Sequence, residues 1–301
     1  MQQQIWAAVV VSAIGWGTGG VVSRVALGDG ASPYEIALAR GVIAGIGIVV
    51  FLAVRRRLGR PEPIAVKVGL VMAVTNMAVP FVVSNVALQY ASAGFVALPA
   101  ALIPLMTAGL AHLLLPDERL TTAKVLGLVV ALAGVAVLLL SGDSGLVEGG
   151  RPLLAGALGL GSVFTISLGS IYAKRHAGEY RLLEVSGIQF LVGAVIIAIA
   201  SLIADGAAGF GPTEAWPELG YLAVMATLVP FLLFYWLIRH VTATYASIVG
   251  YIVPLIAVIV GVVALDEQVQ PGILIGGLLI VAGVAITDRL ERRYRARADR
   301  G

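Results

Sequence analysis

The fold of this protein follows from a stretch that its sequence contains twice. Residues 79–104 read VPFVVSNVALQYASAGFVALPAALIP, and residues 229–254 read VPFLLFYWLIRHVTATYASIVGYIVP. At this offset of 150, the Val-Pro-Phe that starts each copy and the proline that ends it coincide. Beyond residue 116 the offset becomes 149, so that residues 133–136 (AGVA) return as residues 282–285. Because the offset is close to half of the 301 residues, it indicates a duplicated half rather than a short solenoid repeat.

The composition indicates that the bilayer is the solvent for most of the chain. Hydrophobic residues make up 59% of the sequence and charged residues only 12%, about half the charged share of a soluble domain. Apolar runs of about 20 residues, the length that spans a bilayer as a helix, recur from end to end. The absence of cysteine excludes disulfides, thiolate metal sites and cysteine nucleophiles.

The apolar runs predict an all-α, polytopic integral membrane protein with ten transmembrane helices. They are too long, and alternate too little, to be the strands of a membrane barrel. Short breaks rich in Pro, Gly or charge separate them, so we expect no appended soluble domain. The predicted spans are residues 4–26, 33–54, 65–89, 93–115, 121–141, 152–174, 183–203, 217–239, 243–265 and 271–288.

Small residues spaced four apart occur in several of these spans. Examples are Gly15 with Gly19, and Gly272 with Gly276. Small-xxx-small pairs let two helices approach closely in lipid, so we expect close helix contacts at these positions.

The distribution of Lys and Arg predicts the orientation. If the N-terminus is cytoplasmic, 17 of the 20 basic residues lie in inner loops or in the C-terminal tail. Only Arg24 and Arg151 then lie outside, and Arg40 lies within the second span. Cytoplasmic loops carry such an excess of Lys and Arg, so both termini are predicted to be inside.

The domain organisation follows from the number of spans in each half. Each half has five, an odd number, so the second half enters the membrane from the opposite face. The prediction is therefore a 5+5 inverted repeat, an architecture typical of transporters, with the substrate site where the repeats meet. We place the first repeat at residues 1–145 and the second at 146–290. A basic cytoplasmic tail, 291–301, is expected to contact anionic lipid headgroups.

Several short motifs occur along the spans: Trp16-Gly17 with Arg24, Leu38-Ala39-Arg40, Pro104 and Pro254 followed by Pro-Asp-Glu and Leu-Asp-Glu, and Gly127 with Ala133-Gly134-Val135. In these motifs and in its five-plus-five duplication, the whole chain resembles the drug/metabolite transporter (DMT) superfamily, and within it ten-helix bacterial exporters of the EamA type. The second half departs from the pattern, because Gln189 stands where the first half has Arg40 and no Trp-Gly pair occurs in its first span.

The resemblance implies export of small metabolites, with amino-acid exporters of the YddG kind as the most similar members. It also implies a central cavity formed by the first four spans of each half. The fifth and tenth spans would be peripheral.

Arg40 is the one basic residue well inside a span. It lies seven residues beyond Pro33, which corresponds to a depth of about 10 Å in a helix. A charge at that depth is costly and marks a functional position. Two roles remain open from the sequence: a structural or gating role, with the side chain reaching toward the outer interface, and contact with a substrate carboxylate.

Polar residues inside the other spans supply further candidates for the cavity. The spacing of Thr165 and Tyr172, and of Thr244, Ser247 and Tyr251, places each set on one face of its helix. Hydrogen bonding between helices is the alternative role for the hydroxyl groups. Asn76 and Trp16 complete the predicted set, because Trp16 lies too deep for the interfacial aromatic belt.

Four prolines at equivalent places in the two halves, Pro80, Pro104, Pro230 and Pro254, each remove a helical hydrogen bond. They are predicted hinges for a rocking motion, with a static bend as the alternative. The carbonyl groups that they release need partners from neighbouring helices or from cavity water.

Acidic residues all fall in loops or at helix ends. Glu35 and Glu184 start equivalent spans, where a negative charge complements the helix dipole. Asp266 and Glu267 are expected to be solvated loop acids. Because no carboxylate is predicted near the middle of the membrane, the protein is expected to act as a facilitator rather than by proton coupling.

The predicted function is export of small metabolites, with amino acids as the expected substrates, by alternating access across the bacterial inner membrane. Multidrug or nucleotide-sugar transport is an alternative, and a membrane enzyme or a lipid-handling scaffold is an alternative of a different class. Sequence motifs of zinc hydrolases, serine hydrolases and P-loop proteins are absent. The expected partners are a small-molecule substrate and membrane lipids, without nucleic acid, cofactor or metal. The oligomeric state is left open, with a monomer plausible.

Overall fold

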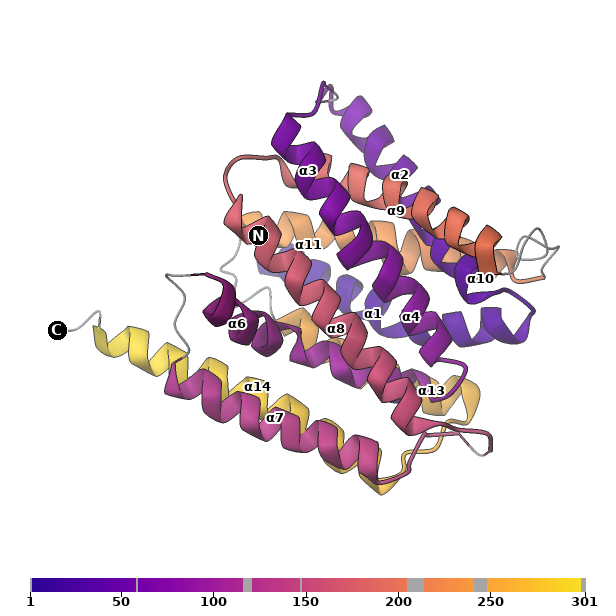
Figure 1. Ribbon diagram of the computed structural model, residues 1–301, viewed down its shortest axis with the longest axis vertical. Helices are drawn as coiled ribbons and strands as arrows, with labels where there is room; N and C mark the ends of the chain where they lie inside the picture. Colours follow the sequence, from indigo (N-terminus) through magenta and orange to yellow (C-terminus); the bar gives the residue numbers. More distant parts are fainter. Residues whose placement is uncertain are drawn as a thin grey trace.

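The computed structural model describes residues 2–57, 59–115, 121–146, 148–204, 214–240 and 248–298, and this part of the chain is helical without a β-strand (Figure 1). The α-helices are α1 (Gln2–Gly28), α2 (Pro33–Val54), α3 (Pro63–Met72), α4 (Val79–Ala87), α5 (Ala93–Ala97), α6 (Ile103–Leu114), α7 (Thr122–Leu140), α8 (Pro152–Arg175), α9 (Leu182–Ala204), α10 (Trp216–Ala223), α11 (Val229–His240), α13 (Ile248–Leu265) and α14 (Pro271–Ala298). The predicted all-α class is confirmed.

Eight helical segments of the described chain are long and apolar enough to cross a membrane, and two shorter apolar helices follow them. Nine of them match a predicted span to within two residues at each end, and the other, Ile252–Leu265, ends where the ninth predicted span (243–265) ends. Large apolar side chains lie on the outside of the bundle, among them Leu140, Ile203 and Val263 at 80%, 81% and 79% exposure. Soluble proteins rarely expose apolar surface so extensively, so these helices form a polytopic membrane bundle.

The repeated Val-Pro pair has the same local structure in both halves. A π-helical turn, Ala73–Ala78, precedes Pro80, and another, Val224–Leu228, precedes Pro230. The amide of Val79 donates to the carbonyl of Val74, and that of Val229 donates to the carbonyl of Val224, five residues back in each case. A proline cannot donate a backbone hydrogen bond, and such π-turns are frequent at functional sites.

Close glycine contacts of the predicted kind join α7 and α14, which lie side by side at the lower edge of Figure 1. A Cβ atom added to Gly134 would lie 2.6 Å from the carbonyl oxygen of Gly276, and one added to Gly276 would lie 2.8 Å from that of Gly134. About two turns along the same pair of helices, a Cβ atom added to Gly127 would collide with the carbonyl oxygen of Gly283, and one added to Gly283 would collide with that of Gly127. The two helices therefore run antiparallel with their backbones in contact, which only glycine permits.

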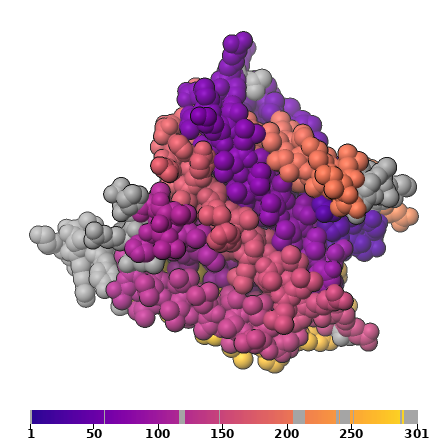
Figure 2. Space-filling model, in the orientation of Figure 1, coloured from indigo at the N-terminus to yellow at the C-terminus, as the bar shows by residue number. Residues whose placement is uncertain are grey.

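The other helices form the body of the bundle. The first helix packs against α10, α11 and α13, whereas α8 packs against α4 and α6, and α2 packs along α9. On the face shown in Figure 2, α8 lies between the α3–α4 segment and α7. The N-terminal end of α1 and the last turns of α14 lie on the same side of the bundle (Figure 1).

The acidic residue Glu267 corrects one prediction. It was expected to be solvated, but its side chain is only 5% exposed and lies against the start of α5. Its carboxylate accepts the N–H of Ala93 at 2.8 Å and that of Gly94 at 3.4 Å. The preceding Asp266, which is exposed as predicted, has a φ of 52°. This left-handed conformation, which aspartate tolerates, turns the chain so that Glu267 folds back into the protein.

Candidate functional site

The principal cavity has a volume of about 580 Å³ and lies at the centre of the bundle. Among the described residues that line it, the polar side chains are few: Arg40, Asn76, Gln189 and Thr227, with the indole of Trp16. The other described lining residues are apolar, a composition typical of small-molecule sites. Its lining residues are Trp16, Arg40, Met72, Asn76, Phe81, Ala100, Ala101, Ile103, Pro104, Ile166, Gln189, Phe190, Ala226, Thr227, Phe231, Phe234, Gly250 and Val284.

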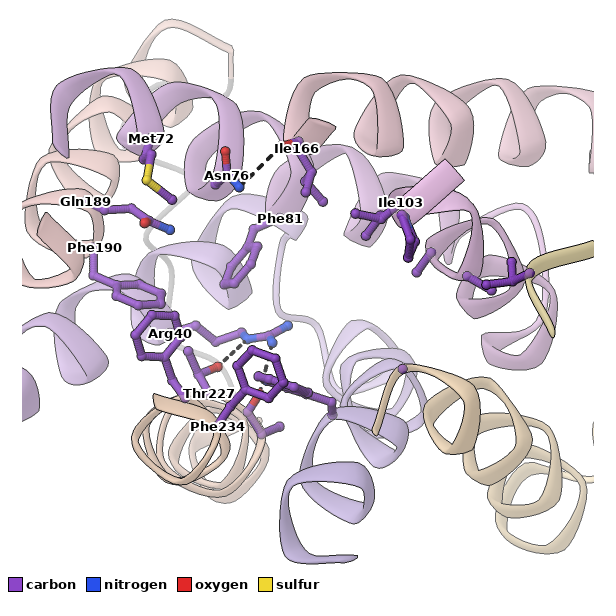
Figure 3. A pocket seen from close by; sticks show the side chains of 18 residues that line it. Arg40, Met72, Asn76, Phe81, Ile103, Ile166, Gln189, Phe190, Thr227 and Phe234 are labelled. Atoms are coloured by element: carbon purple, nitrogen blue, oxygen red, sulfur yellow. Dashed lines mark hydrogen bonds between the residues drawn. The ribbon is translucent and has the colours of Figure 1, made fainter. Parts of the chain in front are cut away.

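Arg40 extends from α2 across the cavity to the second π-turn (Figure 3). Its Nε donates to Thr227 Oγ1 at 2.8 Å, and its Nη2 donates to the carbonyl oxygen of Ala226 at 3.2 Å. The guanidinium carbon lies 4.4 Å from the centre of the Phe81 ring, a cation–π arrangement. Both hydrogen-bond acceptors are neutral, so these contacts hold the guanidinium without neutralising its charge.

Pro230 explains why the Ala226 carbonyl is available to Arg40. In a regular helix the amide of residue 230 would donate to the carbonyl of residue 226, but proline has no N–H. The released carbonyl accepts the Arg40 hydrogen bond instead. Thr227 Oγ1 donates to the carbonyl of Leu222 at 2.8 Å, so its hydroxyl is oriented to accept from Arg40. The repeated proline and the half-buried cation of Arg40 thus form one structural unit.

The first π-turn presents Asn76 to the cavity. Its Oδ1 accepts a hydrogen bond from Thr75 Oγ1 at 2.9 Å, and its Nδ2 lies 3.5 Å from the carbonyl oxygen of Ile166 on α8. A Cβ atom at Gly169 would collide with the side chains of Thr75 and Asn76. Helix α8 therefore approaches this turn closely because residue 169 is glycine.

The second π-turn has a matching neighbour on α1. A Cβ atom at Gly15 would collide with the carbonyl oxygen of Met225 and the ring of Pro230. Ser12, one turn earlier, places its hydroxyl 3.5 Å from the carbonyl oxygen of Pro230. Small residues of α1 and α8 thus fit against the two π-turns, one in each half.

Aromatic rings form much of the apolar wall. Trp16 lies 5.4 Å from Phe234, centre to centre, and Phe190 lies 5.4 Å from Phe231 in an edge-to-face arrangement. Phe81 is 6.4 Å from Phe190. Such pairs stabilise beyond their area of contact and limit the orientations available to each ring.

The structure brings together some of the predicted site residues and separates others. Trp16, Arg40, Asn76 and the predicted hinge residue Pro104 line the cavity. Thr165 and Tyr172 are not among the lining residues.

Local contacts explain where those two residues lie. The hydroxyl of Thr165 donates to the carbonyl of Ser162 at 3.0 Å on its own helix. The ring of Tyr172 lies 5.0 Å from that of His176, in a separate packing cluster. The residue of α8 that reaches the cavity is Ile166, so the polar face of this helix is not the face that lines it.

Three predicted residues of the ninth span lie outside the described part of the structure: Thr244, Ser247 and the side chain of Tyr251.

The other three predicted hinge prolines occupy different positions in their helices. Pro80 and Pro230 follow the π-turns, whereas Pro254 lies inside α13.

Sequence reasoning did not include Gln189 and Thr227 among the cavity residues. Gln189 stands at the position equivalent to Arg40, and that equivalence was the available signal. Thr227 is the repeat counterpart of Met77, so no polar pattern marked it. In addition, Val284 of α14 reaches the cavity, although this helix was expected to be peripheral.

Comparisons with known proteins agree with this architecture. The profile of the EamA-like transporter family matches residues 4–140 and 153–287. A solved crystal structure with 20% sequence identity has a similar fold, with a TM-score of 0.64 over 97% of this chain and 99% of that chain.

Curated relatives are also similar over most of their length. The probable terminal-alkyne amino-acid exporter of Streptantibioticus cattleyicolor is 26% identical over 98% of this chain and 97% of that protein. The uncharacterized transporter YvbV of Bacillus subtilis is 25% identical over 94% and 91%. The uncharacterized inner membrane transporter YedA of Escherichia coli K12 is 27% identical over 82% and 78%.

These findings confirm the resemblance seen in the sequence and identify a transporter rather than an enzyme. A transporter of this kind takes a small-molecule substrate and spans the membrane several times. The chain belongs to the EamA-like transporter family, within the drug/metabolite transporter superfamily.

Proposed function

We propose that this protein exports small metabolites, with amino acids as the expected substrates, from the cytoplasm across the bacterial inner membrane. Substrate occupies the central cavity, and access alternates between the two sides of the membrane. The proposal includes a 5+5 inverted repeat of ten membrane helices with both termini in the cytoplasm.

One observation carries the proposal: the cavity is lined by equivalent positions of the two halves. Asn76 and Ala226, Phe81 and Phe231, and Ala100 and Gly250 all line it, each pair at the offset of 150. Arg40 and Gln189 line it at the offset of 149. A cavity at the junction of two repeats is where transporters of inverted-repeat architecture bind their substrates.

The contacts of α7 and α14 support the inverted relationship. Gly127 is equivalent to Gly276, and Gly134 is equivalent to Gly283, at the offset of 149. The contacts pair Gly127 with Gly283 and Gly134 with Gly276. If the two halves are exchanged, Gly127 takes the place of Gly276 and Gly283 takes the place of Gly134, so each contact becomes the other. A twofold axis between antiparallel helices requires this exchange.

The chemistry of the cavity favours amino acids over the alternative substrates. A nucleotide sugar carries two phosphate groups, which proteins hold with several Arg or Lys residues, whereas the described lining contains one cation. A cationic drug would face Arg40 without a carboxylate among the described lining residues. The relative in Streptantibioticus is named as a probable exporter of an amino acid, which agrees with a carboxylate-bearing substrate.

Transport assays in reconstituted vesicles test this function. Purified protein in liposomes is loaded with unlabelled compound, and counterflow of the labelled compound is measured for amino acids, nucleotide sugars and cationic dyes. We expect counterflow of amino acids above that of protein-free liposomes. Counterflow of nucleotide sugars or dyes alone would contradict the proposed substrate class, and the absence of any flux would contradict transport of all three classes.

A further inference from the structure

The unsatisfied polar groups of the cavity indicate what kind of molecule fits it. A guanidinium carries five N–H donors. The Nε donor of Arg40 and one Nη2 donor bind Thr227 and Ala226. Both hydrogens of Nη1 and the second of Nη2 have no hydrogen-bond partner among the described residues. These donors form the end-on fork that binds a carboxylate with two parallel hydrogen bonds.

The charge of Arg40 also has no counter-ion in the described structure. The ion pairs Arg24 with Glu267, His176 with Glu179, and Arg181 with Glu184, all between described residues, do not involve Arg40. A guanidinium in an apolar cavity favours an anion strongly, because the low local dielectric constant strengthens the attraction. The contacts to Thr227 and Ala226 account for the orientation of Arg40, and an anionic substrate would supply the missing charge.

Gln189 provides a second, independent observation. The residue is only 4% exposed, and its Oε1 has no hydrogen-bond partner among the described residues although the side chain lines the cavity. An unpaired buried acceptor is unfavourable, because it has given up its hydrogen bonds to water without gaining a replacement. Rotation of the amide by half a turn exchanges its oxygen and nitrogen, and the oxygen breaks no hydrogen bond when it turns toward the cavity. The side chain is therefore suited to accept a hydrogen bond from a bound molecule.

The two unsatisfied groups are separated by an apolar region. In the view of Figure 3, Gln189 and Asn76 lie on one side of the Phe81 ring, and Arg40 lies on the other. A molecule that reaches both must have a polar group at each end and an apolar body between them. The end at Arg40 is anionic, and the end at Gln189 is a neutral hydrogen-bond donor.

We propose that the cavity selects a two-ended monocarboxylate: the carboxylate binds Arg40, an apolar body lies along the aromatic wall, and a neutral donor at the far end binds Gln189. This inference rests on the proposed transport function, because it names the cargo of the same cavity. It assigns different tasks to the equivalent positions 40 and 189, so the two halves recognise the two ends of one molecule. Amines that lack a carboxylate are excluded by the like charge of Arg40.

Binding to the purified full-length protein in lipid nanodiscs tests the inference without transport. The probes are 6-hydroxynorleucine, norleucine, hexanoate and pentylamine, each titrated by calorimetry. We expect 6-hydroxynorleucine to bind more tightly than norleucine, hexanoate to bind, and pentylamine to bind at least about tenfold more weakly than norleucine. Equal binding of the amine and the carboxylates, or no binding of any carboxylate, would overturn the proposal.

Variants of Arg40 and Gln189 test recognition of the two ends of the ligand separately. Arg40→Gln is expected to weaken all three carboxylates by about tenfold or more. Gln189→Leu, which replaces the amide with an apolar side chain of similar size, is expected to abolish only the preference for 6-hydroxynorleucine over norleucine. Arg55→Gln is the matched control, because Arg55 also lies over an aromatic ring at the end of α2, 5.5 Å from Phe51, but does not line the cavity.

A second Arg40 variant and a comparison of binding with flux decide the cases that the first variants leave open. Where Arg40→Gln does not fold, Arg40→Lys keeps the charge but lacks the fork, and weaker binding of hexanoate by this variant is expected. Unchanged carboxylate binding in the folded Arg40 variant, or a preference for the hydroxyl group that survives Gln189→Leu, would overturn the inference. Tight carboxylate binding with no flux in liposomes would instead contradict the transport function and leave the recognition intact.

Discussion

The guanidinium of Arg24 lies 3.5 Å from the carboxylate of Glu267, measured from Nε to Oε1. The same carboxylate oxygen accepts the N–H of Ala93 at 2.8 Å, and Arg24 Nη1 donates to the carbonyl of Ala91 at 2.9 Å. These contacts join α1, the loop after α13 and the start of α5, three segments that are far apart in the sequence. The side chains of Arg24 and Glu267 are only 24% and 5% exposed, so the ion pair is largely shielded from water.

We predict that Glu267→Ala destabilises the protein by about 3 kcal/mol, because it leaves a mostly buried cation and two amides without their acceptor. Glu267→Gln retains one acceptor oxygen and is expected to destabilise less. The measurement is the thermal unfolding midpoint in detergent. The neighbouring Asp266→Ala is the control, because that residue is exposed. Equal midpoints for the two alanine variants would show that the Glu267 contacts contribute nothing to stability.

The packing of α7 against α14 leads to a second prediction. Gly134→Ala places a Cβ atom 2.6 Å from the carbonyl oxygen of Gly276, which is backbone and cannot move aside. We expect a loss of about 1–3 kcal/mol, as for other overpacked sites. Gly161→Ala on α8 is the matched control, because nothing lies within 4 Å of an added Cβ there. If both variants unfold at the same temperature, the close approach of α7 and α14 is not required for stability.

Pro230 tests whether the repeated proline acts as a hinge or only bends the helix. Pro230→Ala supplies an N–H that competes with Arg40 for the Ala226 carbonyl. We expect the fold to remain and the counterflow rate to fall by about tenfold, which corresponds to about 1.4 kcal/mol in the barrier. Pro152→Ala at the start of α8 is the control, because a first-turn proline breaks no helical hydrogen bond. An unchanged rate in Pro230→Ala would favour a static bend.

The orientation is tested with single cysteines, which are clean reporters because the chain has none of its own. Arg57 follows α2 and Glu214 precedes α10, and both side chains are exposed. A membrane-impermeant maleimide should label Arg57→Cys only from the cytoplasmic side of oriented vesicles, and Glu214→Cys only from outside. Labelling of both from one side would contradict the inverted repeat.

The last prediction concerns energy coupling. None of the described residues that line the cavity is Asp, Glu or His, so none can exchange a proton there. Glu35 lies in a capping box, in which its carboxylate accepts the N–H of Ser32 at 2.7 Å. With the membrane potential clamped, a pH gradient is expected to leave the uptake of a zwitterionic substrate unchanged. Accumulation driven by the gradient and lost in Glu35→Gln would show proton coupling and identify its carboxylate.

The sequence by itself determined the properties that depend on local pattern and period. Apolar runs of spanning length predict membrane helices in any protein, and the constant offset between the two Val-Pro-Phe motifs indicates duplicated halves. The equivalence of positions 40 and 189 was also visible, and so was the likeness to the family. These features require no knowledge of which helix packs against which.

Only the tertiary structure decided which polar groups meet. Arg40 binds Ala226 and Thr227, more than 180 residues away, because the proline-linked π-turn faces α2 in the folded bundle. Glu267 appeared to be a solvated loop acid, yet it is buried against α5 because a left-handed turn at Asp266 folds it inward. Ile166 lines the cavity where Thr165 was predicted. Burial and pairing depend on contacts between distant segments, whereas hydropathy and helical spacing describe each segment alone.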